Sequence, residues 1–196
     1  QALGVNLNKA KTIYRDSVTA QKYSEAKIAA VAVDETKLAE YYEANKETFD
    51  YYTVRHILVK CDENAEDAVV QEKNKLAQDI LDRVNNGEDF AALAKEFSED
   101  DGSKDNGGVY DVYQYTNFVT EFMEWTFSHN VGDTGIVRTV HGFHVMKLDA
   151  INNTYETIKK DDLKKAYQTD EYQTKLNEKL NDGSVKIEIL KGYSDY

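Results

Sequence analysis

TVRHILVK, residues 53–60, alternates branched and polar side chains, a pattern that predicts a β-strand. IVRTV at 136–140 and GFHVMKLDA at 142–150 have a similar character, and they meet at His141 and Gly142. Two strand patterns joined by so short a connection predict a hairpin. We therefore expect the middle of the chain to be organised around a small, mostly antiparallel sheet.

Helices are predicted between these strands. Apolar residues over 65–85 recur at three- and four-residue spacing, as in an amphipathic helix, and Gly87 follows in the usual C-terminal position. This stripe consists of Ala65, Ala68, Val69, Leu76, Ile80, Leu81 and Val84. EDFAALAKEFS (88–98) predicts a second helix, SEDDGSKDNGG (98–108) a loop, VYDVYQY (109–115) a short strand and NFVTEFMEWTFSH (117–129) a helix. The resulting order indicates an α+β domain.

The two flanks of the chain predict helices. Residues 1–50 are helical in pattern almost throughout, and Asp34 is the expected N-cap of a helix over 35–49. In the tail, a charged helix is expected near 157–181, followed by a strand-like run at 184–193. The narrow apolar stripe of the tail helix favours packing against another helical segment.

Composition excludes several classes of function. The 196 residues carry a net charge of −12, and residues 53–150 alone hold nineteen acidic and nine basic side chains. Such a segment repels phosphate, so we expect no nucleic-acid partner. The single cysteine, Cys61, excludes an internal disulfide and a cysteine-built zinc site. No apolar run approaches the ~20 residues of a membrane-spanning helix. Residues 1–10 lack a signal-peptide pattern, and a chain that begins with Gln is expected to be a mature or trimmed form.

Three histidines lie on the predicted strands or their connection: His56, His141 and His144. From the residues alone, a metal site, an acid–base pair and a structural hydrogen bond between strands are all open. A metal site built from His141, His144 and an acidic residue has no HExxH or similar spacing to support it.

Four blocks occur in order along the middle of the chain: VRHILVK, FAALAKEFSEDDGSKDNGG, FVTEFMEWTF and GFHVMKL. Together they resemble parvulin-type peptidyl-prolyl cis–trans isomerases over residues 53–149. The lead-in YYEANKETFDYYTVRHIL and the helical flanks are similar to the extracellular foldase lipoproteins of Gram-positive bacteria. The resemblance implies an isomerase domain at 53–150 with a four-stranded antiparallel sheet surrounded by helices. It also implies a helical chaperone module made from residues 1–52 and 151–196.

The same resemblance implies the residues of an active site. The catalytic positions would be His56, Asp100 and His144, and counting from Phe97-Ser98 favours Asp100 over its neighbour Asp101. The substrate-binding positions would be Tyr110, Phe118, Phe122, Thr139 and His141. Simpler interpretations stay open: a structural histidine pair, ordinary core packing for the two phenylalanines, and a solvated loop position for Asp100.

Three features depart from the family pattern. In GGVYDVY (107–113), Asp111 replaces a glycine and Tyr110 stands where leucine is common, and the turn GDTGIV (132–137) is short and lacks proline. After the first strand, KCDENAEDA (60–68) offers Lys60 alone among acids, so a phosphorylated substrate would be repelled.

The function implied is a peptidyl-prolyl isomerase and foldase that needs no metal or cofactor and does not require phosphorylated substrates. Its partners would be unfolded or partly folded exported polypeptides with X-Pro bonds, at the extracellular face of the cell membrane. The resemblance is compatible with a lipid anchor ahead of residue 1 and with a homodimer. One alternative is a holdase chaperone whose parvulin domain is catalytically weak or inactive, and another is a scaffold for a single partner.

Overall fold

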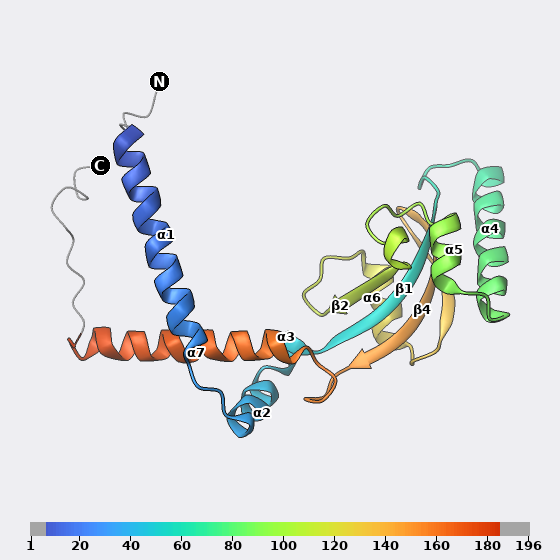
Figure 1. Cartoon of the computed structure of the whole chain (residues 1–196). Helices are drawn as coiled ribbons and strands as arrows, with labels where there is room; N and C mark the ends of the chain where they lie inside the picture. Colours follow the sequence, from blue (N-terminus) through green and yellow to red (C-terminus); the bar gives the residue numbers. More distant parts are fainter. Residues whose placement is uncertain (1–6, 185–196) are drawn as a thin grey trace. The chain divides into compact units, whose positions relative to one another are not determined.

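The structure, a computed structural model, describes residues 7–184 and contains two compact units. One unit consists of residues 7–44 and 159–184 of the described chain, and the other consists of residues 45–158 (Figure 1). The strand-like run predicted at 184–193 lies, from residue 185 on, outside the described residues.

Residues 45–158 are built on a four-stranded sheet. Its strands are β1 (Tyr51–Lys60), β2 (Val109–Tyr113), β3 (Thr134–Thr139) and β4 (Gly142–Asn152), in the order β2-β1-β4-β3. Every neighbouring pair is antiparallel. The expected α+β fold with a four-stranded antiparallel sheet is therefore confirmed, including the β3–β4 hairpin that turns at 140–141.

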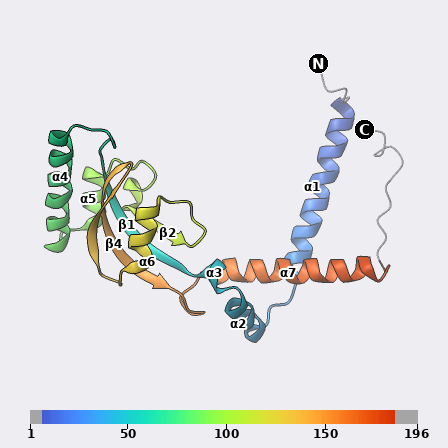
Figure 2. The same ribbon diagram turned by 180° about the vertical axis from the view of Figure 1, so that it is seen from behind.

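One face of the sheet packs against α4 (Asp67–Asn85) and α5 (Phe90–Phe97), which lie together beside the strands in Figures 1 and 2. The buried residues of this core are Ile57, Val59, Cys61, Ala77, Ile80, Phe90, Leu93, Ala94, Phe143 and Val145. The stripe predicted for α4 was wrong at its beginning, where Ala68 and Val69 are exposed. Val70 and Ala77 face the core although the predicted stripe does not include them.

The opposite face packs against α6 (Thr120–Ser128), seen on the other side of the strands in Figure 2. Val54, Val112, Phe122, Trp125, Val137, Met146 and Leu148 form its buried core. The helix is shorter than predicted, so that Phe118 lies in the segment that leads into it. The loop between α5 and β2 contains a short 3-10 helix, η1 (Lys104–Asn106).

The second unit consists of α1 (Leu7–Ala29), α2 (Glu35–Ala44) and α7 (Lys160–Asn181). Asp34 caps α2 by accepting the backbone N–H groups of Thr36 and Lys37, as predicted. The helix predicted over 35–49 is divided at Asn45, whose backbone leaves the helical region, and α3 (Lys46–Phe49) belongs to the other unit.

Packing within this unit is concentrated on α7. The buried side chains there are Leu38, Tyr42, Leu163, Tyr167 and Gln168, and the Gln168 amide donates to the carbonyl of Val31 at 2.8 Å. In contrast, α1 has no buried side chain among the described residues. This agrees with the loose spacing of its apolar residues, which defines no continuous face.

Candidate active site

The two central strands bring His56 and His144 together. His56 lies on β1 and His144 on β4, and strand periodicity directs both side chains to the α6 face of the sheet. Their Nδ1 atoms are 3.1 Å apart, and their rings stack at 5.3 Å between centroids. Both side chains are buried, at 4 % and 5 % exposure. Eighty-eight residues of sequence therefore separate two groups that are in direct contact.

Asp100 reaches His56 from the loop that follows α5. The Ser98 hydroxyl accepts the backbone N–H groups of Leu58 and Asp100, which ties this loop to β1. Asp100 Oδ2 then lies 2.9 Å from His56 Nε2. Asp101, the alternative in the sequence, points into solvent and pairs with Lys104.

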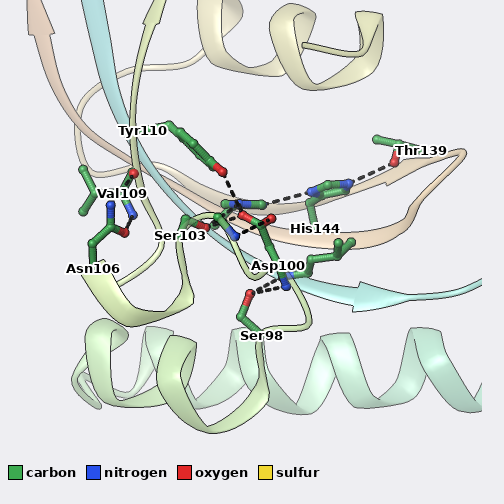
Figure 3. Close-up of polar contacts among 11 residues, drawn as sticks. Ser98, Asp100, Ser103, Asn106, Val109, Tyr110, Thr139 and His144 are labelled. Atoms are coloured by element: carbon green, nitrogen blue, oxygen red, sulfur yellow. Dashed lines mark hydrogen bonds and ion pairs between the residues drawn. The ribbon is translucent and has the colours of Figure 1, made fainter.

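Two hydroxyl groups donate to the same carboxylate oxygen. Asp100 Oδ2 accepts from Ser103 at 2.5 Å and from Tyr110 at 3.0 Å, as Figure 3 shows. Ser103 is only 1 % exposed and was absent from the predicted site. Its spacing of three residues after Asp100, within a turn in which both take part, was the available signal.

The hydrogen bonds that link Asp100, His56, His144 and Thr139 determine which of their atoms carry the protons. Burial raises the pKa of Asp100, but the bonds from Ser103, His56 and Tyr110 outweigh it and lower this pKa to about 2. The carboxylate is thus ionised at neutral pH and accepts the Nε2–H of His56. His56 Nδ1 must then accept from His144 Nδ1–H, and His144 Nε2 accepts from the Thr139 hydroxyl at 2.9 Å.

Both histidines are neutral in this arrangement. Burial lowers the pKa of His56, and it lowers the pKa of His144 to about 3 with a contribution from the neighbouring His56 and His141. The contact between the two rings agrees with this, because a proton on both Nδ1 atoms would leave two donors facing each other. The four hydrogen-bonded side chains, Asp100, His56, His144 and Thr139, therefore form a fixed polar wall with a single negative charge on Asp100.

Gly108 allows the start of β2 to lie in close backbone contact with His56. The His56 N–H donates to the Gly108 carbonyl at 2.8 Å, and a Cβ on Gly108 would lie 2.2 Å from the His56 carbonyl oxygen. Gly108 also has a φ of +77°, in the region that favours glycine. The close contact that aligns His56 with β2 thus depends on glycine at this position.

An aromatic wall faces the polar one. The Phe118 and Phe122 rings stack at 4.9 Å, and Phe122 contacts His56 and His144 edge-on at 5.5 and 5.7 Å. Tyr110 packs edge-on against Phe118 at 5.1 Å. These side chains line a groove of about 720 Å³. Apolar walls with a few convergent polar groups are typical of a ligand-binding site.

The remaining predicted positions differ in their access to this groove. His141, in the turn between β3 and β4, is exposed and lines it. Thr139 is only 4 % exposed and lies behind His144, so its contact is with the histidine. The groove is also lined by Lys60, Cys61, Asp62, Glu99 and Asp101, and the charged residues among them form its rim.

Asp111 lies outside the groove although its neighbour Tyr110 lies within it. Alternation along β2 places Asp111 on the other face of the sheet, where it accepts a hydrogen bond from Thr53 at 2.8 Å. This departure from the family pattern therefore leaves the groove unchanged, whereas Tyr110 adds a hydroxyl to it.

Residues 7–184 bring no three His, Cys, Asp or Glu side chains into an arrangement for a metal ion. Within the same residues, the helices lack the length and apolar character that a bilayer crossing requires.

Comparison with known proteins relates these features to a family. The model of the PPIC-type PPIase domain matches residues 36–151. Foldase protein PrsA of Caldanaerobacter subterraneus subsp. tengcongensis is 41 % identical over 122 residues, which cover 62 % of this chain and 36 % of the relative. Chaperone SurA of Pseudomonas savastanoi pv. phaseolicola is 34 % identical over 147 residues, which cover 71 % of this chain and 34 % of the relative.

Among solved structures, PrsA from Bacillus subtilis is similar with a TM-score of 0.45 and 25 % identity, over 97 % of this chain and 72 % of that one. The chain spans only about a third of the length of the two curated relatives above. The family model nevertheless matches more than half of the chain, including β1, β2, β3, all of β4 except its last residue, and the whole polar wall. The chain therefore belongs to the PPIC-type PPIase domain family, the parvulin type of peptidyl-prolyl isomerase.

Proposed function

We propose that this chain catalyses cis–trans isomerisation of X-Pro bonds in unfolded or partly folded polypeptides. The observation that supports this most directly is the groove itself. It combines an aromatic wall with a polar wall whose charge and tautomers are set by hydrogen bonds. His56, Asp100 and His144 are the proposed catalytic residues, and Tyr110, Phe118, Phe122 and His141 the proposed substrate contacts, with Thr139 acting through His144.

The chemistry requires a lower barrier to rotation about one bond. Resonance gives the peptide C–N bond partial double-bond character and a barrier of ~18–20 kcal/mol. The charge-separated resonance form places negative charge on the carbonyl oxygen. An anionic carboxylate beside that oxygen disfavours this form, and an apolar wall removes the water that would stabilise it. A groove with both features binds the twisted amide better than either planar form, which is the requirement for catalysis.

The first test is the cis-to-trans rate of short X-Pro peptides with this chain and with its Asp100→Ala and His144→Ala variants. We expect clear acceleration by the wild type and a loss of about tenfold or more in each variant, because each removes a charged or hydrogen-bonding part of the wall. Asp105→Ala is the matched control, since Asp105 is an exposed acid of the same loop that does not line the groove.

Circular dichroism must show that the variants remain folded. Absence of acceleration by the wild type with every peptide would refute the isomerase proposal. The second candidate, a holdase whose groove binds peptides without turnover, would then be tested by suppression of aggregation of unrelated clients.

We further propose that the helical unit of α1, α2 and α7 is a chaperone module for the same clients. Two of the relatives carry the names foldase and chaperone, and this supports a role in folding exported proteins. Action at the extracellular face of the membrane, a lipid anchor and a homodimer belong to this proposal. Cell fractionation and sedimentation of the full-length protein would test these three features.

A further inference from the structure

We propose that Tyr110 is a positioning residue: its hydroxyl holds the Asp100 carboxylate in the orientation that hydrogen-bonds to His56. This inference rests on the proposed isomerase function, and it assigns Tyr110 a role in addition to its place in the substrate groove. The carboxylate needs such a support because rotation of an Asp carboxylate about its terminal torsion is only weakly restricted. Asp100 also lies on a loop, so its backbone alone does not determine where Oδ2 points.

Tyr110 is placed to connect the two walls of the groove. It extends from β2, its hydroxyl lies 3.0 Å from Asp100 Oδ2, and Figure 3 shows it directed at that carboxylate. The centroid of its ring lies 5.4 Å from that of the His56 ring and 5.1 Å from that of the Phe118 ring. A single side chain from a rigid strand therefore contacts the carboxylate, the first histidine and the aromatic wall. Leucine at this position would supply the apolar contact without the hydrogen bond.

Gly102 supplies an independent observation. A Cβ at this position would lie 2.6 Å from the Tyr110 hydroxyl oxygen, which is the nearest atom to it. Gly102 does not have a positive φ, so its backbone conformation is open to alanine. The absent side chain thus leaves the space in which the phenol reaches Asp100. Alanine at 102 should displace the hydroxyl while leaving both the phenol and the carboxylate in the protein.

The test uses Tyr110→Phe, Gly102→Ala and the double variant, with Tyr52→Phe as the control. Tyr52 lies on β1, and its ring packs edge-on against Phe127 at 4.8 Å. Two quantities are measured for each protein: the pKa of Asp100, from the ¹³C shift of its carboxyl, and kcat/KM with an X-Pro peptide across pH. The charged or titratable groups facing Asp100 are His56 from β1, His144 from β4, Tyr110 from β2 and Asp101 from its own loop.

Tyr110→Phe should raise the pKa of Asp100 from about 2 toward its ordinary 3.8, because one of the donors that stabilise the carboxylate is lost. It should lower kcat/KM by roughly three- to tenfold, mainly through kcat, because the ring that contacts substrate is retained. Gly102→Ala should produce both effects in a smaller form. In the double variant, Gly102→Ala should add nothing to Tyr110→Phe, since the hydroxyl that it displaces is already absent.

An unchanged Asp100 pKa in Tyr110→Phe would overturn the proposal, whatever the rate, because Tyr110 would then act only through the groove. Additive effects in the double variant would overturn it as well. The carboxyl titration needs no substrate. If the wild type accelerates no peptide, the isomerase proposal fails, while the titration still decides whether Tyr110 holds Asp100.

Discussion

The two faces of the sheet differ in chemistry although the same strands form both. Toward α4 and α5, β1 and β4 present Ile57, Val59 and Val145, and this core is entirely apolar. Toward α6, the same strands present His56 and His144, directly adjacent in sequence to Ile57 and Val145. The period of two in a strand lets alternate residues serve stability on one face and a polar site on the other. Each histidine is therefore held in place by a sequence neighbour, Ile57 or Val145, whose side chain is packed in the apolar core.

The largest effect expected from this comparison is on the stability of the apolar face. Ile57→Ala should lower the free energy of unfolding by about 2–5 kcal/mol, because it removes buried methyl groups and leaves a cavity between β1 and the helices. Urea unfolding would measure this change. Isomerisation per folded molecule should stay close to the wild-type value, because the histidines lie on the other face.

Val69→Ala on α4 is the matched control, because Val69 is 40 % exposed and its loss should cost less than about 0.5 kcal/mol. A fall in turnover of folded Ile57→Ala as large as that of Asp100→Ala would contradict the division between the faces.

Acid should destabilise the protein through the polar face. The folded-state pKa of His144 is lowered from 6.5 to about 3, so the unfolded chain binds more protons throughout that range. Stability must therefore fall as the pH drops below 6.5, with ~1.4 kcal/mol for each unit by which the pKa is lowered. The lowered pKa of Asp100 adds a fall of the same sign between 3.8 and about 2.

Urea unfolding at several pH values between 8 and 4 would measure this dependence. His144→Gln should show a smaller fall, since one titrating group is removed, whereas Ile57→Ala should give a curve parallel to the wild type. Equal pH dependence in wild type and His144→Gln would show that the histidine is not buried in its neutral form.

The smallest effect concerns the rim of the groove, where Asp62, Glu99 and Asp101 outnumber Lys60. A peptide with Lys before proline should have a kcat/KM about threefold above that of the Glu peptide at low salt. The ratio should approach one near 1 M salt, since exposed charges are then screened. Glu99→Gln should reduce the ratio, and Asp79→Asn on α4 should not. A preference for Glu, or for phosphoserine, would contradict the predicted repulsion.

Much of the fold could be predicted from local pattern. The strands 53–60 and 142–150 alternate side chains with a period of two, and the second helix carries Phe90, Leu93 and Ala94 at helical spacing, all buried as expected. Boundaries were less predictable. Apolar spacing predicts that Ala68 and Val69, in the first turn of α4, face the core, but both are exposed, because spacing alone does not show where a helix begins.

The candidate site was predictable only in part. The family resemblance pointed to His56, Asp100 and His144, and the structure brings these three side chains into one hydrogen-bonded chain. Ser103 was missed, because a serine in a polar loop carries no sign of burial. The placement of Asp111 was also missed, because only the pairing of β2 with β1 shows which face it occupies.

The sequence by itself thus determined the elements of this protein, since periodicity and capping act over a few residues and are visible locally. It also determined the acidic character of the groove's rim, which follows from composition. Only the tertiary structure decided which atoms carry the protons in the hydrogen bonds between Asp100 and Thr139, the role of Ser103 and the contact of Tyr110 with Asp100. These features depend on atoms from β1, β2, β4 and one loop meeting within about 3 Å, a distance set by strand pairing and packing and by no local pattern.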